Sequence, residues 1–316
     1  MLLNSLKSIL WINRRDEKDV VDIYNSLTPF VRLALADPNN NMLNFGYWTH
    51  TTSPLQAQIE LCRVVGEFAG LQSAKKVIDV GGGFCAPAIL WKSMYNNLDI
   101  ICIDVNHKQL AAALEMPITT STIAKSDQFC IVNKNLEQTK PISLVNAVAI
   151  RLPFADNCVD TIVALESAQH FKPFSGFLRE SRRVLRPKGL FVIAIPILGP
   201  KLSNQSFLRQ LVKLGILYFT WASEHYSLDK IKSAMTAEGF KMLDIQHIGH
   251  NVYEPCADYY IQNRQILRQR LKTKTFPHSK SLLIDFVERI IYISALKMKD
   301  SSQKEIIDYV LIKAAR

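Results

Sequence analysis

The sequence predicts an α/β fold organised around a strand that ends in a glycine-rich loop. Residues 77–80 form a short apolar run rich in β-branched side chains, three glycines follow at once, and residues 86–95 have a helical pattern. A second apolar run, residues 98–105, comes after that helix. Buried strands that alternate with helices, the first of them entering its helix through glycines, are typical of nucleotide-binding α/β folds.

The residues around the loop distinguish two classes of cofactor. A dinucleotide site favours G-x-G-x-x-G, whereas here Asp79 precedes Gly81, Gly82 and Gly83 and the third position of that pattern is not glycine. A carboxylate beside the loop would repel a pyrophosphate but attract an ammonium or a sulfonium group. The glycines let a ligand lie against the backbone. The alternative is a strand–turn–helix that binds no ligand.

The second strand ends near Asp104, about 25 residues after Asp79. A carboxylate at the tip of this strand can accept hydrogen bonds from both ribose hydroxyls, as in other nucleotide-binding sheets. The spacing from the glycine loop therefore predicts that Asp104 binds the ribose of the cofactor.

The rest of the chain continues the alternation of strands and helices. We expect helices at 19–36 and 54–69 before the glycine loop, with an aromatic turn at 44–48 between them. After the second strand we expect strands at 142–149, 160–165, 190–195, 241–248 and 306–312, and helices at 177–185, 207–222, 225–240, 253–272 and 281–298. Residues 117–141 have no clear periodicity and are interpreted as an insertion.

Length and composition limit the possible functions. The 316 residues fit one large domain or a core with a lid, and 48% hydrophobic residues can bury a sizeable core. The net charge of +10 comes from scattered lysines and arginines, which disfavours nucleic acid as a partner. The six cysteines contain no C-x-x-C pair, so we expect reduced thiols, no metal site and a cytoplasmic protein.

Residues 1–15 are amphipathic and lack the features of a secretory signal. No apolar run of the sequence is long enough to span a membrane. The favoured interpretation is a helix that packs on its own core, and the alternative is a peripheral membrane contact.

Several ordered motifs resemble those of class I S-adenosylmethionine-dependent methyltransferases that modify natural products, quinones and related lipids. The loop matches h-h-D-h-G-x-G-x-G except for Cys85 at the last glycine, and LPFAD, DTIVALESAQHF and RVLRPKG follow in order within residues 152–189. The resemblance implies a Rossmann-like seven-stranded sheet whose last strand is antiparallel. It also implies a helical cap at 1–74, a cofactor-binding core at 75–200, and lid helices with the final strands at 201–316.

The resemblance further implies that the cofactor is S-adenosylmethionine. Around it we expect Asp79, Gly81, Gly82, Gly83, Asp104, Val105, Val148, Ala149, Leu165, Tyr24 and Tyr47. Around the acceptor we expect Trp48, Gln169, Trp221 and Tyr259, and core packing is the alternative for the aromatic residues. Val148 replaces an acid that many relatives place near the adenine, which leaves only backbone groups of Val148 and Ala149 to bind it.

The loop after the fourth strand carries the candidate catalytic residues. Relatives with A-L-E-S-x-H-H have proposed histidine bases here, and this chain keeps the second as His170 while Gln169 replaces the first. His170 would suit removal of a hydroxyl proton, and Glu166 could stabilise a cation or remove a proton from carbon. The alternatives are a histidine that packs the loop and a carboxylate that binds backbone N–H groups.

We therefore predict methyl transfer to a small, apolar or aromatic molecule, with a hydroxyl oxygen preferred over carbon or nitrogen as the acceptor atom. A non-catalytic protein that binds the cofactor or a protein partner is a second hypothesis, supported by the substitutions at Cys85 and Val148. A nicotinamide oxidoreductase is the third, and Asp79 disfavours it. The sequence predicts neither the identity of the acceptor nor the oligomeric state.

Overall fold

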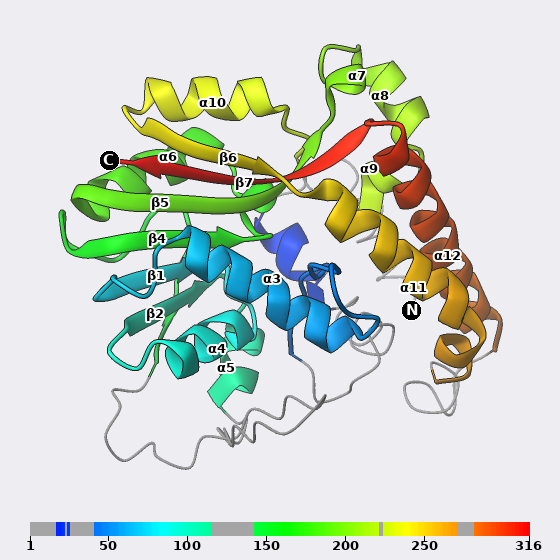
Figure 1. Cartoon of the computed structure of the whole chain (residues 1–316), viewed down its shortest axis with the longest axis horizontal. Helices are drawn as coiled ribbons and strands as arrows, with labels where there is room; N and C mark the ends of the chain where they lie inside the picture. Colours follow the sequence, from blue (N-terminus) through cyan, green and yellow to red (C-terminus); the bar gives the residue numbers. More distant parts are fainter. Residues whose placement is uncertain (1–16, 23, 26–40, 115–141, 221–223, 271–280) are drawn as a thin grey trace.

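A computed structural model describes residues 17–22, 24–25, 41–114, 142–220, 224–270 and 281–316 (Figure 1). Three sequence predictions lie outside these residues: the N-terminal segment, the insertion at 117–141 and the position of Trp221. Most of the helix expected at 19–36 lies outside them as well. All structural statements below concern the described residues.

Seven strands form one sheet in the order β3-β2-β1-β4-β5-β7-β6. Their bounds are β1 Lys76–Val80, β2 Asp99–Asp104, β3 Ser143–Asn146, β4 Val159–Leu165, β5 Leu185–Leu198, β6 Lys241–His247 and β7 Ile307–Ala315. The pairs among β1 to β5 are parallel, and β7 runs antiparallel to both β5 and β6. The predicted seven-stranded sheet with an antiparallel last strand is confirmed.

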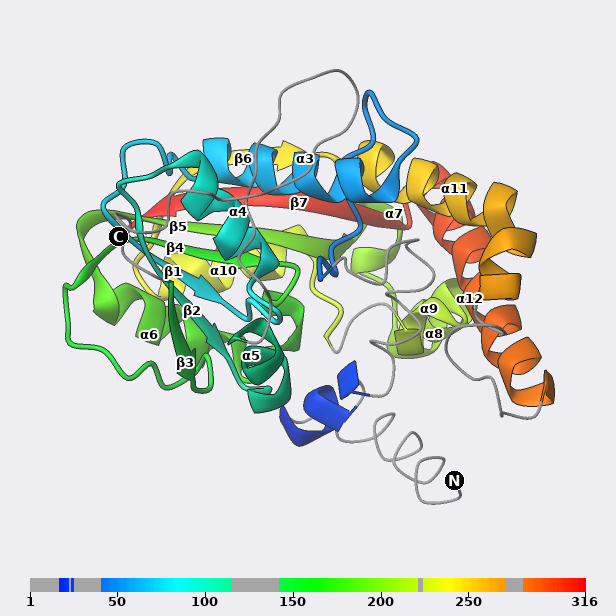
Figure 2. The same cartoon turned by 90° about the horizontal axis from the view of Figure 1, so that it is seen from below.

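Helices cover both faces of this sheet. The core helices are α3 Pro54–Phe68, α4 Ala86–Met94, α5 His107–Leu114, α6 Phe174–Val184 and α10 Leu228–Ala237. Figure 2 shows α3 and α4 on one face and α6 and α10 on the other. Successive side chains of a strand point to opposite faces, so Val77 packs with α3 and α4 whereas Ile78 packs with α6 and α10.

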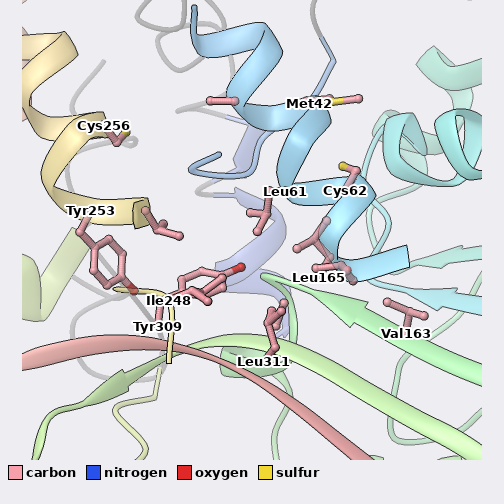
Figure 3. Packing of buried hydrophobic residues seen from close by; sticks show 14 of the residues in the cluster. Met42, Leu61, Cys62, Val163, Leu165, Ile248, Tyr253, Cys256, Tyr309 and Leu311 are labelled. Atoms are coloured by element: carbon pink, nitrogen blue, oxygen red, sulfur yellow. The ribbon is translucent and has the colours of Figure 1, made fainter. Parts of the chain in front are cut away.

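A second group of helices follows β5 and β6. It consists of α7 Pro200–Ser203, α8 Phe207–Leu214, α9 Leu217–Thr220, α11 Gly249–Arg270 and α12 Ser281–Gln303. Tyr253 of α11 packs against Tyr309 of β7, with ring centroids 5.9 Å apart, and Leu61 and Cys62 of α3 lie nearby in the same cluster (Figure 3). The side chains of these residues join the cap, the sheet and the lid in one core. No helix in the described part of the chain is long and apolar enough to cross a membrane.

Three elements differ from the sequence prediction. The third strand, expected at 142–149, covers only Ser143–Asn146. The apolar helix expected at 207–222 is divided into α8 and α9, because Gly215 between them has φ +55. The fifth strand begins at Leu185 instead of residue 190: Leu185 pairs with Val159, and the register shifts before Leu190 pairs with Thr161. Lys188, in the predicted turn, has φ +67 within this irregular stretch.

Candidate cofactor and acceptor site

The glycine loop begins directly after β1 and is fixed to the neighbouring strands. The backbone N–H groups of Gly81 and Gly82 donate to the carbonyl of Ile103 at 2.7 and 3.1 Å. A Cβ atom at Gly81 would lie 2.4 Å from Cβ of Ser167, and one at Gly82 would lie 2.2 Å from Sγ of Cys102. The first two glycines are therefore required for the close packing of the loop on β2 and on the end of β4.

Gly83 differs from the other two glycines. Its φ is +57, but a Cβ atom there would meet no atom closer than 3.7 Å. Its backbone N–H donates to Oδ2 of Asp104 at 2.8 Å. This side of the loop is open, as a loop that admits a ligand must be.

Cys85 occupies the position of the missing glycine and caps the N-terminus of α4 with φ 58, a left-handed conformation that glycine normally adopts. Its side chain is buried in the core cluster, and its Sγ donates to the carbonyl of Gly83 at 3.8 Å. The Cys85 thiol, and then burial, raise the pKa of Cys102. The substitution thus keeps the backbone shape of the loop and directs its side chain into the core.

Asp79 and Asp104 lie at the ends of adjacent strands. Burial, and then the charge of Asp104, raise the pKa of Asp79 to about 7. Oδ2 of Asp79 is buried and has no hydrogen-bond partner among the described residues. A buried acceptor without a partner is costly, so this oxygen fits a donor or a cationic group supplied by a ligand.

Asp104 is held in place by the backbone. Oδ2 accepts from Gly83, and Oδ1 accepts from the N–H of Asn106 at 2.7 Å. Burial raises the pKa of Asp104 in spite of these bonds. Each oxygen retains a second lone pair, so the carboxylate can still accept two ribose hydroxyls. With the open side of Gly83 and the free oxygen of Asp79, this donor and acceptor set fits S-adenosylmethionine.

Glu166 follows β4 with φ 51 and lies between the cap and the last strand. Its Oε1 accepts from the backbone N–H of Phe45 and from the hydroxyl of Tyr309, both at 3.0 Å. Burial raises the pKa of Glu166 to about 8, although these two bonds lower it. Burial thus favours the neutral, protonated form of this carboxyl group.

His170 lies four residues further on, at the end of the short helix η2 Ala168–His170. Its Nε2 is 3.2 Å from the hydroxyl of Tyr24, and the two rings meet edge to face at 5.6 Å. Burial, with the charges of Glu166 and Asp104, raises the pKa of Tyr24. Tyr24 thus lies between the predicted ribose ligand and the two predicted catalytic residues.

The aromatic turn at residues 44–48, before α3, contacts α11. The backbone N–H of Trp48 donates to the carbonyl of Asn251 at 2.9 Å, and Asn251 Nδ2 donates to the hydroxyl of Tyr47 at 3.1 Å. The rings of Trp48 and Tyr259 lie 5.6 Å apart. These contacts fasten the cap to α11. A role for Tyr47 at the cofactor, and for Trp48 and Tyr259 at the acceptor, stays a prediction.

The other predicted residues lie at or just after the carboxyl ends of β2, β3 and β4. Val105 follows β2, and Val148 and Ala149 follow β3, where the N–H of Ala147 donates to the carbonyl of Asp104 at 3.2 Å. Leu165 is the buried last residue of β4. Gln169 Nε2 donates to the carbonyl of Glu166 at 2.7 Å, whereas its buried Oε1 has no partner among the described residues.

Sequence reasoning missed Tyr309 and Phe45, the two residues that hold Glu166. Tyr309 is 143 positions away in the sequence and reaches the site only because β7 lies beside β5. The available signal was a polar aromatic residue within an apolar strand. No group of three metal-ligating side chains is found in the part of the chain that the structure describes.

Comparison with known proteins agrees with this geometry. Residues 78–193 match a family described as a methyltransferase domain. Erythromycin 3''-O-methyltransferase of Saccharopolyspora erythraea is 25% identical over 71% of this chain and 69% of its own length. A sterol 24-C-methyltransferase of Gibberella zeae is 25% identical over 55% of this chain, and the alignment spans only 41% of that relative.

The fold is also similar to that of a mycolic acid cyclopropane synthase solved in complex with S-adenosylhomocysteine and CTAB. The TM-score is 0.70 at 18% identity, over 93% of this chain and 95% of the other. At this identity the likeness concerns the fold.

Proposed function

Because the chain belongs to the class I S-adenosylmethionine-dependent methyltransferases, we propose that it methylates a hydroxyl oxygen of a small, apolar or aromatic acceptor. The cofactor supplies a methyl group that its sulfonium already activates. The protein must then bind the cofactor, align the acceptor, exclude water and receive one proton. In this proposal Asp104 and the glycine loop bind the cofactor, and the loop after β4 handles the proton.

The contact between Tyr24 and His170 is the observation that favours oxygen over carbon as the methylated atom. Nε2 of His170 is 3.2 Å from the Tyr24 hydroxyl, so it lies within reach of an O–H group on this side of the site. The pKa of Tyr24 is raised, so its phenol carries a proton at neutral pH and can donate it to Nε2. An acceptor hydroxyl that takes the place of the Tyr24 hydroxyl would give its proton to Nε2 of His170 as the acceptor oxygen takes the methyl group. The relatives named as O-methyltransferases support the same choice.

Methylation of carbon is the second candidate, and Glu166 favours it. Its buried carboxyl group lies four residues from His170 and is fixed by Phe45 and Tyr309. In its ionised form it could stabilise a cation on carbon and then remove the proton that the new C–CH3 bond displaces. The resemblance to sterol 24-C-methyltransferases supports this alternative.

Product analysis distinguishes the two candidates. The purified protein is incubated with S-adenosylmethionine and with phenols, glycosylated macrolides and sterols, and the methylated atom is identified by mass spectrometry and NMR. We expect O-methylated products. A product methylated only on carbon would replace the proposal by its alternative.

His170→Ala tests the proposed base. We expect kcat to fall about a hundredfold or more, because the acceptor proton loses its base, while the Kd for S-adenosylhomocysteine is unchanged in calorimetry. His250→Ala is the matched control, because His250 is an exposed histidine at the start of α11. If the kcat of His170→Ala equals that of the parent protein at every pH, His170 only packs the loop and is not the base.

A further inference from the structure

Apolar side chains are exposed on two lid helices, α8 and α12, which both contact α9. Leu208 and Val212, one turn apart on α8, are 68% and 79% exposed. Phe286, Ile293 and Leu296 of α12 are 62%, 41% and 43% exposed, and their spacing places them on one side of that helix. Single exposed apolar residues are ordinary, but a group of them at one end of the molecule indicates an interaction site.

The two helices lie at the same end of the molecule. Figure 2 shows α8, α9 and α12 gathered there, away from β1 to β3, and Figure 1 places them at the same end. A Cβ atom at Gly215, directly after α8, would be 4.0 Å from Lys297 of α12. We call the exposed surface of α8 and α12 the lid face.

Basic residues alternate with the apolar ones on the lid face. Arg209 and Lys213 are exposed on α8, and Arg289 is exposed on α12 between Phe286 and Ile293. None of these three forms an ion pair with another described residue. They therefore leave positive charge available on this surface.

The acidic residues of these two helices are already paired. Residues 207–214 of α8 contain two basic residues and no acidic one, and residues 281–303 of α12 contain three basic and three acidic residues. The three acids pair with other cations, Asp285 with Arg268, Glu288 with Arg264 and Asp300 with Lys297. The lid face thus combines exposed apolar side chains with three cations, Arg209, Lys213 and Arg289, that form no ion pair with a described residue.

We propose that the lid face binds the surface of an anionic lipid bilayer. Amphipathic helices with leucine or phenylalanine beside lysine or arginine bind such surfaces, since the apolar groups enter the interface and the cations meet anionic headgroups. A second copy of the chain would oppose like charges across the contact. Nucleic acid would leave the aliphatic groups of Leu208 and Val212 without a partner. The proposal concerns binding alone and does not depend on which atom is methylated.

Glu224, four residues after the end of α9, contacts the loop that carries His170. Its N–H donates to the carbonyl of Gln169 at 3.0 Å, and its carboxylate pairs with Lys172 of the same loop at 2.5 Å.

Vesicle flotation tests the proposal. The full-length protein is mixed with vesicles of equal parts phosphatidylcholine and phosphatidylglycerol, or of phosphatidylcholine alone. We expect flotation with the anionic vesicles, weaker binding to the neutral ones, and loss of binding as salt is raised. The double variant Leu208→Ser, Val212→Ser should lower the partition coefficient about tenfold or more.

Matched controls separate this surface from general effects. Leu243→Ser changes a leucine of β6 that is 48% exposed, and it should leave flotation unchanged. Lys213→Gln should lower partitioning about fivefold, whereas Lys232→Gln on α10 should not. All five substituted positions are exposed, so the variants should keep the melting temperature of the parent protein and its affinity for S-adenosylhomocysteine.

Several results would overturn the proposal. One is absence of flotation with anionic vesicles, and another is equal flotation of the Leu208→Ser, Val212→Ser and Leu243→Ser proteins. A dimer in sedimentation velocity that the double variant dissociates would assign the lid face to self-association. Displacement of the protein from vesicles by duplex DNA, with the same dependence on Lys213, would assign it to nucleic acid.

Discussion

The carboxyl group of Glu166 lies between the cap and the last strand, and it accepts hydrogen bonds from Phe45 and Tyr309. Its pKa is about 8 in the folded protein against 4.5 for an ordinary glutamate. A carboxyl group whose pKa is raised by folding contributes stability that is complete below the unfolded value and is lost as pH rises through the folded value. For Glu166 this loss falls between about pH 4.5 and 8.

Glu166→Gln isolates that contribution. Glutamine keeps an Oε1 that can accept from both partners, but it does not ionise. Between pH 6 and 8 the parent protein should therefore lose about 2–3 kcal/mol of unfolding free energy relative to the variant. Urea unfolding of both proteins at several pH values measures the difference. Parallel pH profiles would show that the folded-state pKa is not raised.

At the residue scale, the sequence could predict Asp79, Asp104 and the glycines, because each lies within a few positions of a strand end. It could not predict what holds Glu166. Phe45 and Tyr309 come from the cap and from β7, and only the strand order β4-β5-β7 brings Tyr309 near β4. A contact across 143 positions has no local pattern in the sequence.

Among the elements, the turn at 44–48 depends on one close approach to α3. Gly46 has φ +84, and a Cβ atom there would lie 2.7 Å from Cβ and 2.9 Å from the carbonyl carbon of Ala57. Asn44 fixes the same turn, since its Oδ1 accepts from Gly46 and its carbonyl accepts from Gln58 Nε2 at 2.7 Å. The turn can thus pack on α3 only with glycine at position 46.

Gly46→Ala should lower the melting temperature more than Gly70→Ala does. Both residues have positive φ, so both substitutions introduce backbone strain, but a Cβ atom at Gly70 would meet no atom closer than 3.8 Å. The difference between the variants then reports the clash with α3, for which we expect about 2 kcal/mol or more. Thermal unfolding followed by circular dichroism measures it. Equal destabilisation would mean that the turn moves away from α3 without cost.

The helices and strands show where periodicity is and is not informative. The apolar run at 207–222 predicted one helix, and its pattern alone does not reveal that Gly215 adopts φ +55 and divides α8 from α9. The predicted turn at 186–189 is instead an irregular part of β5, because Leu185 is already paired with Val159. In both cases tertiary contacts or one backbone conformation override the local pattern.

For the molecule as a whole, the candidate cofactor site collects residues from distant parts of the chain. Gly83 follows β1, Asp104 is the last residue of β2, His170 follows β4, and Tyr24 comes from the segment before the cap turn. Asn25, next to Tyr24, accepts from Asn106 Nδ2 at 3.0 Å, which joins that segment to the end of β2. A ligand bound here would therefore stabilise the contact between the N-terminal part of the chain and the sheet.

This gives a prediction for the entire fold. S-Adenosylhomocysteine at a hundred times its Kd should add about 2.7 kcal/mol to the unfolding free energy and raise the melting temperature, whereas NAD at the same concentration should not. Asp104→Asn should abolish most of the shift, because one carboxylate oxygen becomes an amide that cannot accept from a backbone N–H or a ribose hydroxyl. Asp99→Asn, at the opposite end of β2, is the matched control and should retain it. Differential scanning fluorimetry measures all four cases, and an equal shift with NAD or an undiminished shift in Asp104→Asn would contradict the assignment of the ribose site.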